Sequence, residues 1–485
     1  MSAILVALVL PLAGALGIAL AGRRSNVSNL RESITLVTAV VLFGTVLQLL
    51  DPVLAGERPE LLLFELLPGL PVAFRVEPLG MVFALIAAGL WIVNSVYSIG
   101  YMRGNNEQHQ TRFYVCFALA IAAALAIAFA GNLLTLFLFY EALTLVTYPL
   151  VTHAGTEKAK RGGRTYLGIL MGTSVLFLLP ALIYVWHLTG TTDFRPGGIL
   201  PAGMDRGAVA VLLALFMFGI GKAALMPFHR WLPAAMVAPT PVSALLHAVA
   251  VVKAGVFSVV KVIVYIFGLD TLAGATGWLV ALSGFTIIAA SLVALHADNL
   301  KRRLAYSTVS QLAYVILAAA ILAPLSVMGA ALHIAAHAFG KITLFFAAGA
   351  IYTAAHKTEV SQLDGIGRRM PWTMAAFGIG ALSMIGLPPA AGFVSKWYLV
   401  SGAVQQAQWA ALAVVLASTL LNAGYFLPIR WRAFFRPLSA EAVAHSHGEA
   451  PLPMVIALTL TAAGTLALFF FPDVPLALAR QLVQP

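Results

Sequence analysis

The 485-residue chain has little charge and a single cysteine. With only Cys116 available, a disulfide framework is excluded, and so is any zinc or iron–sulfur site that needs a pair of cysteine thiolates. Only 10% of the residues are charged, whereas soluble globular domains carry about 25%. Because 61% of the residues are hydrophobic, the composition excludes an ordinary soluble domain and indicates an integral membrane protein.

The apolar residues fall into runs long enough to cross a bilayer, which takes about 20 residues. These runs predict an all-α membrane protein with about 14 transmembrane helices. The run from Met1 to Ala21 is interpreted as a retained span, because Arg23 and Arg24 follow it and no basic residue precedes it, the opposite of a signal peptide. The predicted helices begin near Ala3, Ser33, Leu79, Phe113, Asn132, Thr165, Gly207, Thr240, Thr276, Arg303, Leu325, Pro371, Trp409 and Pro451.

Basic residues are distributed unevenly between the predicted loops. With the N-terminus outside, the cytoplasmic loops hold 18 lysines and arginines and the outer loops hold five. This asymmetry follows the positive-inside rule. It predicts a multi-pass protein of a bacterial-type cytoplasmic (inner) membrane. The net charge of +11 then reflects topology, and nucleic acid is not an expected partner.

Six basic residues fall inside the predicted spans, whereas Glu141 is the one acid clearly placed in mid-span. Each lysine at a bilayer centre costs roughly 2.5–3.5 kcal/mol, so five cost roughly 12–18 kcal/mol. That cost equals or exceeds the net stability of a typical protein, about 5–15 kcal/mol. Some of these groups must therefore be neutral, hydrated or ion-paired. The six are Lys222, Arg230, Lys253, Lys261, Lys341 and Lys396.

Glycine and proline interrupt two of the predicted helices. Helix seven reads FMFGIGKAALMPFHRWLPAAM and contains Lys222, and helix twelve lies within GALSMIGLPPAAGFVSKWYLVSG and contains Lys396. Such breaks in corresponding places of two halves indicate inverted repeats around an ion path. The predicted units are residues 1–112 with helices one to three, 113–267 with a first five-helix repeat, 268–436 with a second, inverted repeat, and 437–485 with a linker and helix fourteen.

Glu141 is the strongest candidate for proton transfer, with Lys222 on another helix as its partner. In general, burial raises the pKa of a carboxyl group and a neighbouring cation lowers it. The charge of the lysine would therefore decide when the acid releases its proton. The alternative is a static structural ion pair. Lys253 is the next candidate, since a buried lysine that titrates near neutrality can relay protons.

Helix eleven carries three titratable residues, His333, His337 and Lys341, at four-residue spacing on one face. This stripe favours a proton relay over individually bonded packing residues, and Lys396 would form its far end. Polar residues of helix ten could hydrate the same interior. They are Ser307, Thr308, Ser310 and Gln311.

The remaining titratable residues rank lower. His247 precedes Lys253 by six residues, about 240° round an ideal helix, and is expected to face a different segment. His229 adjoins the first break, near the cytoplasmic surface. Lys261, two turns beyond Lys253, is expected to snorkel to the outer surface. Secondary site candidates are therefore His247 and His229, to which Glu77 is added below.

No metal site and no cofactor is predicted. His333 and His337 could hold zinc, but no acidic third ligand lies nearby in the sequence; paired haem histidines remain an alternative. His445 and His447 belong to a polar linker and are interpreted as solvated. The sequence contains no nucleotide-binding glycine loop.

Together these segments resemble one family, the antiporter-like membrane subunits shared by respiratory complex I, membrane-bound hydrogenases and Mrp-type cation/proton antiporters. The resemblance extends over helices three to thirteen. The segments that carry it are FYEALTL, GKAALMPFHRWLPAAMVAPTPVSALLHAVAVVKAGV, YSTVSQLAY, HAFGKITLFFAAGAI and GLPPAAGFVSKW.

The resemblance implies two inverted five-helix repeats, broken helices seven and twelve, and a hydrated path at the membrane midplane. It implies an acid–lysine pair of Glu141 and Lys222, with Lys253 as a bridging lysine. A lysine at Lys396 is similar to the D-type members of Mrp complexes and some complex I members, whereas another complex I branch has glutamate there. Glu77 stands where the family often has aspartate. The implied helix-eleven relay is His333, His337 and Lys341.

The function implied is that of a proton-translocating, D-type member of an Mrp-type Na⁺/K⁺–proton antiporter. Its expected partners are other hydrophobic subunits, lipid, protons and a monovalent cation, and it would contain no redox site of its own. One alternative is the proton-pumping membrane subunit of a complex I-like NADH-quinone oxidoreductase or a membrane-bound hydrogenase. Another is a structural scaffold with its lysines locked in ion pairs.

Overall fold

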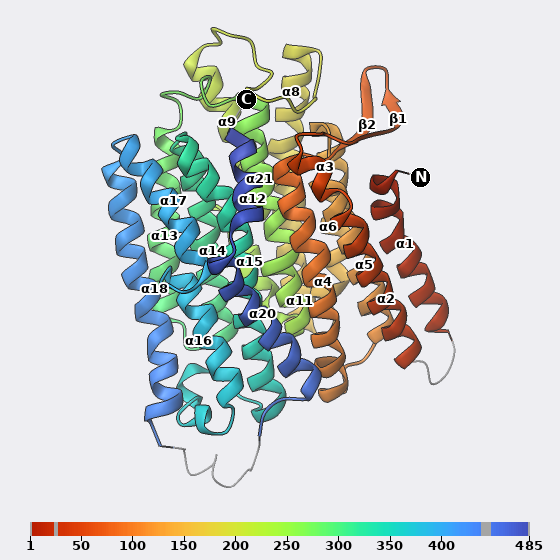
Figure 1. Ribbon diagram of the computed structural model, residues 1–485, viewed down its shortest axis with the longest axis vertical. Helices are drawn as coiled ribbons and strands as arrows, with labels where there is room; N and C mark the ends of the chain where they lie inside the picture. Colours follow the sequence, from red (N-terminus) through yellow and green to blue (C-terminus); the bar gives the residue numbers. More distant parts are fainter. Residues whose placement is uncertain (1, 24–27, 438–447, 484–485) are drawn as a thin grey trace.

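The computed structural model describes residues 2–23, 28–437 and 448–483, so His445 and His447 lie outside the described residues. Within these ranges, 11 helices are long and apolar enough to cross a membrane. Two shorter apolar helices, Arg206–Gly219 and Pro371–Ile385, accompany them. Figure 1 shows the long helices packed side by side. The prediction of a helical, multi-pass membrane protein is confirmed.

The helices are numbered as in Figure 1. They are α1 (Ala3–Ala21), α2 (Ser28–Leu47), α3 (Leu50–Leu54), α4 (Pro78–Gly104), α5 (Gln110–Ala128), α6 (Leu133–Val151), α7 (Glu157–Thr173), α8 (Leu179–Thr189), α9 (Arg206–Gly219), α10 (Trp231–Ala234), α11 (Thr240–Ala244), α12 (Val251–Val262), α13 (Gly277–His296), α14 (Leu300–Ala320), α15 (Pro324–Ala355), α16 (Pro371–Ile385), α17 (Ala391–Gln405), α18 (Trp409–Phe435), α20 (Leu452–Phe470) and α21 (Asp473–Val483).

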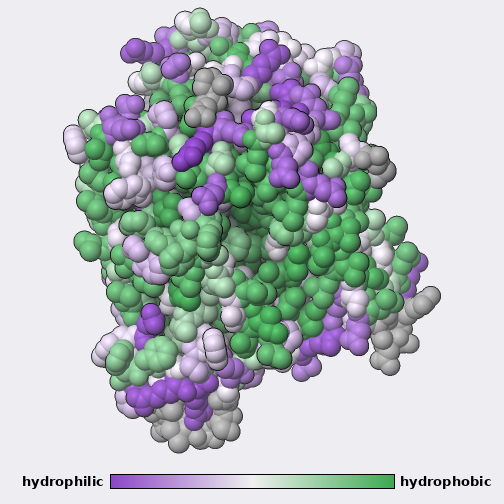
Figure 2. Space-filling view, in the orientation of Figure 1, coloured by the Kyte–Doolittle hydropathy of each residue, from purple (hydrophilic) through white to green (hydrophobic). Residues whose placement is uncertain are grey.

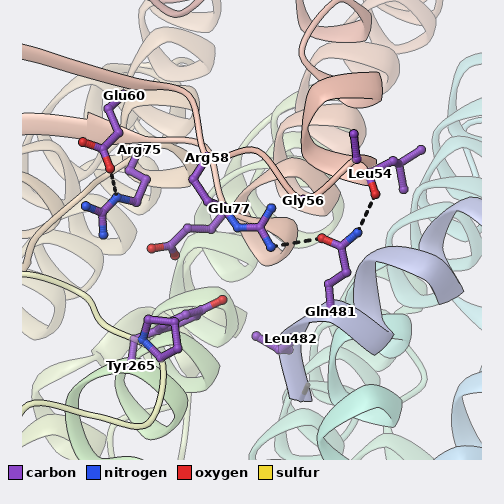
Figure 3. A pocket seen from close by; sticks show the side chains of 11 residues that line it. Leu54, Gly56, Arg58, Glu60, Arg75, Glu77, Tyr265, Gln481 and Leu482 are labelled. Atoms are coloured by element: carbon purple, nitrogen blue, oxygen red, sulfur yellow. Dashed lines mark hydrogen bonds and ion pairs between the residues drawn. The ribbon is translucent and has the colours of Figure 1, made fainter. Parts of the chain in front are cut away.

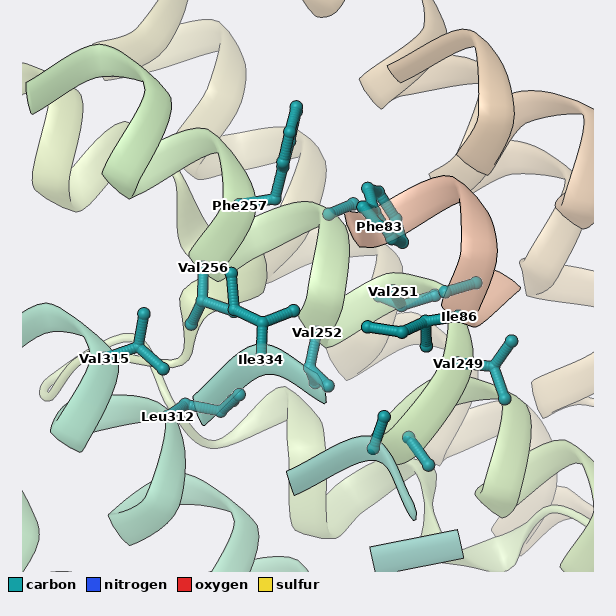
Figure 4. Packing of buried hydrophobic residues seen from close by; sticks show 14 of the residues in the cluster. Phe83, Ile86, Val249, Val251, Val252, Val256, Phe257, Leu312, Val315 and Ile334 are labelled. Carbon is teal, nitrogen blue, oxygen red and sulfur yellow. The ribbon is translucent and has the colours of Figure 1, made fainter. Parts of the chain in front are cut away.

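The span Thr240–Phe267 is the centre of the molecule, and every residue in it is buried. It joins α11 to α12 through a π-helical turn, Leu245–Val249, and ends in a second, Ile263–Phe267. Figure 4 shows its valines and Phe257 packed against side chains of α4, α14 and α15. Polar groups on this span therefore have no direct route to lipid or bulk water and must find partners inside the protein.

The helical ladder is interrupted at the two predicted places. The first interruption follows α9, where a 3-10 turn, Gly221–Ala223, and irregular chain lead to α10. The second separates α16 from α17, and Gly386 begins it with φ +89°. Glycine is required there because L side chains rarely adopt this left-handed backbone conformation.

A two-stranded antiparallel hairpin, absent from the helical prediction, connects α3 to α4. Its strands are β1 (Glu60–Leu67) and β2 (Leu70–Arg75), and Leu67 pairs with Leu70 across the turn. Alternate residues of β2 are buried, whereas β1 is almost wholly exposed. In Figure 1 the hairpin lies at the same end of the molecule as the connection between α8 and α9.

The surface has an apolar middle between two polar ends. In Figure 2, hydrophilic residues gather at the top and bottom, and hydrophobic side chains dominate the face between them. The connections between α1 and α2 and between α4 and α5 lie at the end opposite the hairpin (Figure 1). This distribution is the one expected of a chain whose helices cross a bilayer.

Candidate functional site

Lys222 lies in the break that follows α9, where the 3-10 turn places it inside the protein. The side chain is fully buried. Its Nζ donates hydrogen bonds to the backbone oxygen of Tyr140, at 2.7 Å, and to Thr144 Oγ1, at 2.6 Å. The Lys222 backbone N–H also donates to the Tyr140 hydroxyl at 2.9 Å. Helix α6 therefore holds this lysine with neutral oxygens.

Glu141 directly follows Tyr140 on α6. Both of its carboxyl oxygens are buried and have no hydrogen-bond partner within the described ranges. Glu141 and Lys222 interact electrostatically, yet no ion pair within 4.0 Å joins them among the described side chains. The two predicted partners thus lie close enough for each charge to affect the other, while neither group binds the other directly.

Lys253 and His247 both contact α15. Lys253 Nζ is in hydrogen-bond contact with His337 Nδ1, and both side chains are buried. The ring of His247 packs against Phe345, with centroids 4.8 Å apart. The expectation that His247 faces a different segment from Lys253 is therefore wrong. The π-helical turn Leu245–Val249 adds residues to one turn and changes the phase between the two positions.

The polar stripe of α15 connects to two neighbouring helices. His333 Nδ1 lies 2.8 Å from Ser395 Oγ on α17, and His333 Nε2 lies 3.0 Å from Gln311 Oε1 on α14. The rings of His333 and His337 follow each other with centroids 6.1 Å apart. Two histidines therefore lead from Lys253 to α14 and α17.

Lys341 begins a second branch, four residues further along α15. Its Nζ donates to Ser307 Oγ at 2.8 Å. The Tyr425 hydroxyl lies 3.1 Å from the same oxygen and also contacts Asn422 Oδ1. Asn422 Nδ2 in turn donates to the backbone oxygen of Met384 at 3.2 Å. This branch crosses from α15 through α14 and α18 to the end of α16.

Both branches meet at the break that follows α16. The Met384 backbone oxygen accepts hydrogen bonds from Gln311 at 3.2 Å, Asn422 at 3.2 Å and Lys396 at 3.1 Å. Lys396 Nζ also donates to the Ile385 backbone oxygen at 2.8 Å. Carbonyls at a helix C-terminus lack intrahelical partners and carry partial negative charge. The end of α16 therefore binds a lysine without a carboxylate.

Glu77 and Lys261 form a buried pair away from these branches. Lys261 Nζ lies 3.0 Å from Glu77 Oε2 and donates to the backbone oxygen of Ala130 at 2.6 Å. The prediction that Lys261 snorkels to the outer surface is wrong, since its side chain is 0% exposed. The enclosed span Thr240–Phe267 leaves it no path to the surface.

His229 lies apart from the two branches. Its ring is half-buried, with its centroid 6.2 Å from that of Tyr306. Among the described residues, no group of three or more His, Cys, Asp or Glu side chains is placed to hold a metal ion.

Several residues of the site were missed by the sequence analysis. Tyr140 and Thr144 hold Lys222, while Asn422 and Tyr425 complete the branch from Lys341. Ser395 contacts His333. The available signal was polar side chains at helical spacing inside apolar helices, three or four residues apart.

A cavity of about 700 Å³ opens at the end of the molecule opposite the hairpin, between the connections that precede α5 and α14. Glu107, Lys301, Tyr101 and Tyr352 contribute to its wall. Burial raises the pKa of Glu107, which lies in the α4–α5 connection, and Lys301 partly offsets this rise. A carboxyl group that remains protonated more readily is thus present where water enters this end of the protein.

The sequence matches the model of a known family, described as NADH:quinone oxidoreductase/Mrp antiporter, transmembrane, over residues 130–422. NADH-quinone oxidoreductase subunit N of Desulforudis audaxviator is 34% identical over 386 residues, covering 78% of this chain and 75% of the relative. The A-type subunit of the Na⁺/H⁺ antiporter of Alkalihalophilus pseudofirmus is 30% identical over 86% of this chain and 54% of its own. A chain in the Mrp complex of Dietzia has the same fold, with a TM-score of 0.82, 22% identity, and coverage of 99% and 97% of the two chains.

Proposed function

The chain belongs to the NADH:quinone oxidoreductase/Mrp antiporter transmembrane family, and from this premise we propose that it translocates protons as one subunit of a membrane complex. The proposed complex is an Mrp-type monovalent cation/proton antiporter, in which this chain takes the place of the D-type subunit. The observation that carries the proposal is the series of buried titratable groups from α6 to α17. The groups are Glu141, Lys222, Lys253, His337, His333, Lys341 and Lys396.

The proposed architecture has fourteen spans and two inverted five-helix repeats, residues 113–267 and 268–436. The breaks after α9 and α16 support it, because each interrupts a helix in the corresponding place of one half and each carries a buried lysine. In this arrangement the N-terminus lies outside a bacterial-type cytoplasmic membrane. The basic connections then lie on the cytoplasmic side, as the positive-inside rule requires.

Glu141 and Lys222 form the proposed gate. Lys222 is held by Tyr140 and Thr144 rather than by an acid, so its position can change without breaking a salt bridge. A protonated Lys222 stabilises the Glu141 carboxylate, and its deprotonation or movement favours proton uptake by the acid. Loss of charge at one group thus changes the proton affinity of the next.

Protons then pass along α15 to α17. Lys253 and His337 are in contact, His333 connects to Gln311, and Gln311 shares the Met384 oxygen with Lys396. Side chains that both donate and accept hydrogen bonds are suited to such a relay. Where direct contacts end, at the Glu141 carboxyl and around His247, water molecules complete the path in this proposal.

Partner subunits are expected at the hairpin end of the molecule. The apolar side chains of β1 are exposed there, with Leu62 63% and Phe64 54% exposed. An exposed, largely apolar edge strand is typical of a surface that another protein covers. Other hydrophobic subunits are the partners proposed, together with lipid around the apolar middle.

A second function is favoured by the relative from Desulforudis audaxviator, which is a subunit of an NADH-quinone oxidoreductase. In that case the chain pumps protons as a membrane subunit of a complex I-like enzyme or a membrane-bound hydrogenase. The same residues carry the protons, and electron transfer in partner chains supplies the energy.

Cation-dependent proton flux in everted vesicles that express the whole native complex tests both functions. We expect flux after addition of Na⁺ or K⁺ without any electron donor, and its loss in Lys222→Ala and Glu141→Ala while the complex still assembles. Lys160→Ala is the control, because Lys160 is an exposed lysine paired with Glu157 at 2.8 Å. Flux that requires an electron donor establishes the redox pump instead. Wild-type flux in assembled Lys222→Ala rules out both.

A further inference from the structure

A cavity of about 500 Å³ opens at the hairpin end of the molecule. Figure 3 shows its wall: Arg58 and Gly56 follow α3, Glu60 and Arg75 belong to the hairpin, and Gln481 comes from α21. Segments far apart in the sequence thus enclose one space. Most of its charged side chains already have partners, since Arg75 binds Glu60 at 2.6 Å and Arg58 binds Gln481 at 3.0 Å.

Glu77 forms the inner boundary of this cavity. Its side chain points into the space in Figure 3, beside Arg58 and above Tyr265. Only 3% of the residue is exposed. Behind it, Lys261 is fully buried, with its Nζ 3.0 Å from the Glu77 carboxylate and 4.3 Å from the centroid of the Phe194 ring. Cavity, carboxylate and ammonium therefore follow one another in series.

A purely structural role explains this arrangement poorly. Removing two charges from water costs several kcal/mol for each ion, and apolar side chains of similar size are often at least as stable as a buried pair. The Glu77 oxygen that faces Lys261 has no hydrogen-bond partner within the described ranges. One face of the pair also meets a space that admits water.

Lys261 is also part of the span that carries the relay. It lies eight residues after Lys253 on α12, an axial distance of about 12 Å at 1.5 Å per residue. The buried hydroxyl of Ser258 lies between them in the sequence. The enclosed span thus has one lysine in contact with α15 and another in contact with a carboxylate at the outer cavity.

We propose that Glu77 and Lys261 form an outward-facing station at which protons leave the first half of the chain for the outer side. The Lys261 ammonium transfers a proton to the Glu77 carboxylate, and the resulting carboxylic acid releases it to water in the cavity. The neutral lysine is then reprotonated from the interior. Arg58 and Arg75 face the carboxylate from the hairpin side, and their positive charge favours release of the proton. The proposal rests on the proposed function and adds the position of an exit.

Thiol labelling in the assembled complex tests the opening of the cavity. In a Cys116→Ala background, Tyr265→Cys places a thiol at the cavity floor. We expect a membrane-impermeant maleimide to label it in right-side-out vesicles and not in everted ones. Tyr314→Cys is the matched control, because Tyr314 is also buried but does not contribute to this cavity. A Tyr265→Cys thiol that stays unlabelled from the outer side overturns the proposal.

A pair of substitutions separates proton transfer from ion pairing. Glu77→Gln alone leaves a buried lysine unpaired and can prevent folding, whereas Glu77→Gln with Lys261→Gln keeps the pair neutral and hydrogen-bonded. We expect the double variant to assemble but to lose flux by about a hundredfold or more, as when a proton-transfer group is removed. Glu57→Gln, at an exposed carboxylate of the same end, retains full flux.

The results of this experiment are distinguishable from a failure of the proposed function. Wild-type flux in the assembled double variant, with flux still abolished by Lys222→Ala, refutes the exit and leaves the proposed function intact. Flux retained in both variants refutes the proposed function as well. If the double variant fails to assemble, Glu77→Asp, which keeps the acid, must transport protons, and the labelling result decides whether the cavity is open to the outside.

Discussion

Gly255→Ala is the substitution that most directly tests how the central span positions Lys222. Gly255 lies on α12, two residues after Lys253, and packs against the backbone of the first break. A Cβ atom added at Gly255 would lie 2.3 Å from the Lys222 carbonyl carbon and 2.3 Å from the Ala223 nitrogen. Both are backbone atoms, so neither can rotate away. We therefore expect α12 and the break to move apart.

The size of the effect follows from the geometry. Ordinary van der Waals contact begins at 3.4 Å, so the two segments must separate by about 1 Å. Overpacking of this kind costs about 1–3 kcal/mol of stability. A displacement of about 1 Å between groups that must react together can reduce a rate by on the order of 10²-fold. Proton flux should therefore fall much more than the amount of assembled complex.

The assay compares proton flux and thermal unfolding of the complex for Gly255→Ala and Gly168→Ala. Gly168 also lies inside a helix, α7, but a Cβ there meets nothing within 4 Å. Alanine should stabilise that helix by up to about 1 kcal/mol, because glycine is a poor helix former. Flux and thermal stability equal to wild type in Gly255→Ala would refute the reasoning that close contact with α12 sets the position of Lys222.

Two further predictions concern single interactions. Tyr425→Phe removes the hydroxyl that connects Ser307 to Asn422; a lost hydrogen bond of about 0.5–1.5 kcal/mol should slow flux by about 2–10-fold with unchanged assembly, and wild-type flux excludes a role for the Lys341 branch. At the cytoplasmic end, the hydrogen bond from Arg432 holds the pKa of Asp364 below its usual value. The resulting stabilisation, about 0.2–1 kcal/mol for an exposed pair, is present above the usual pKa and lost as pH falls through the lowered one. Thermal unfolding of Asp364→Asn should therefore differ from wild type at pH 7 and converge with it near pH 3, and a difference that persists at pH 3 contradicts this assignment.

The sequence was sufficient to predict the helical spans and both breaks, because long apolar runs and clusters of glycine and proline act locally. It was less informative where a helix begins with charged residues. Helix α7 starts at Glu157 rather than near Thr165, and Thr156 caps it by accepting a hydrogen bond from the Ala159 N–H. Its first two turns are polar, so hydropathy placed them in a loop.

Hydropathy also missed the hairpin β1–β2, since its leucines and phenylalanines resemble the end of a span. The partners of the buried lysines were unpredictable for another reason. Lys261 and Glu77 are separated by 184 positions along the chain, and Asn422 reaches the Met384 carbonyl from another helix. Such contacts depend on how helices pack, which the pattern of one helix does not encode. The shift in phase of His247 depends on a π-helical turn that periodicity assumes to be absent.

The excess of buried lysines over acids is resolved by backbone oxygens. Lys222, Lys261 and Lys396 each donate to at least one carbonyl oxygen, from Tyr140, Ala130, and Met384 with Ile385 respectively. A carbonyl dipole stabilises an ammonium group, and it remains neutral and can still accept hydrogen bonds after the lysine loses its proton. A carboxylate partner would instead be left as an unpaired buried charge, at a cost of about 3–5 kcal/mol.

The identity of the ligands therefore distinguishes two kinds of buried lysine in this protein. Lys222 and Lys396, bound by neutral oxygens alone, can change charge without leaving an anion behind, which is what a proton carrier requires. Lys261, bound by both a carbonyl and Glu77, can release its proton only if the acid accepts it. Proton movement at Lys261 is thus coupled to Glu77, while at the two breaks it is coupled only to the next group along the path.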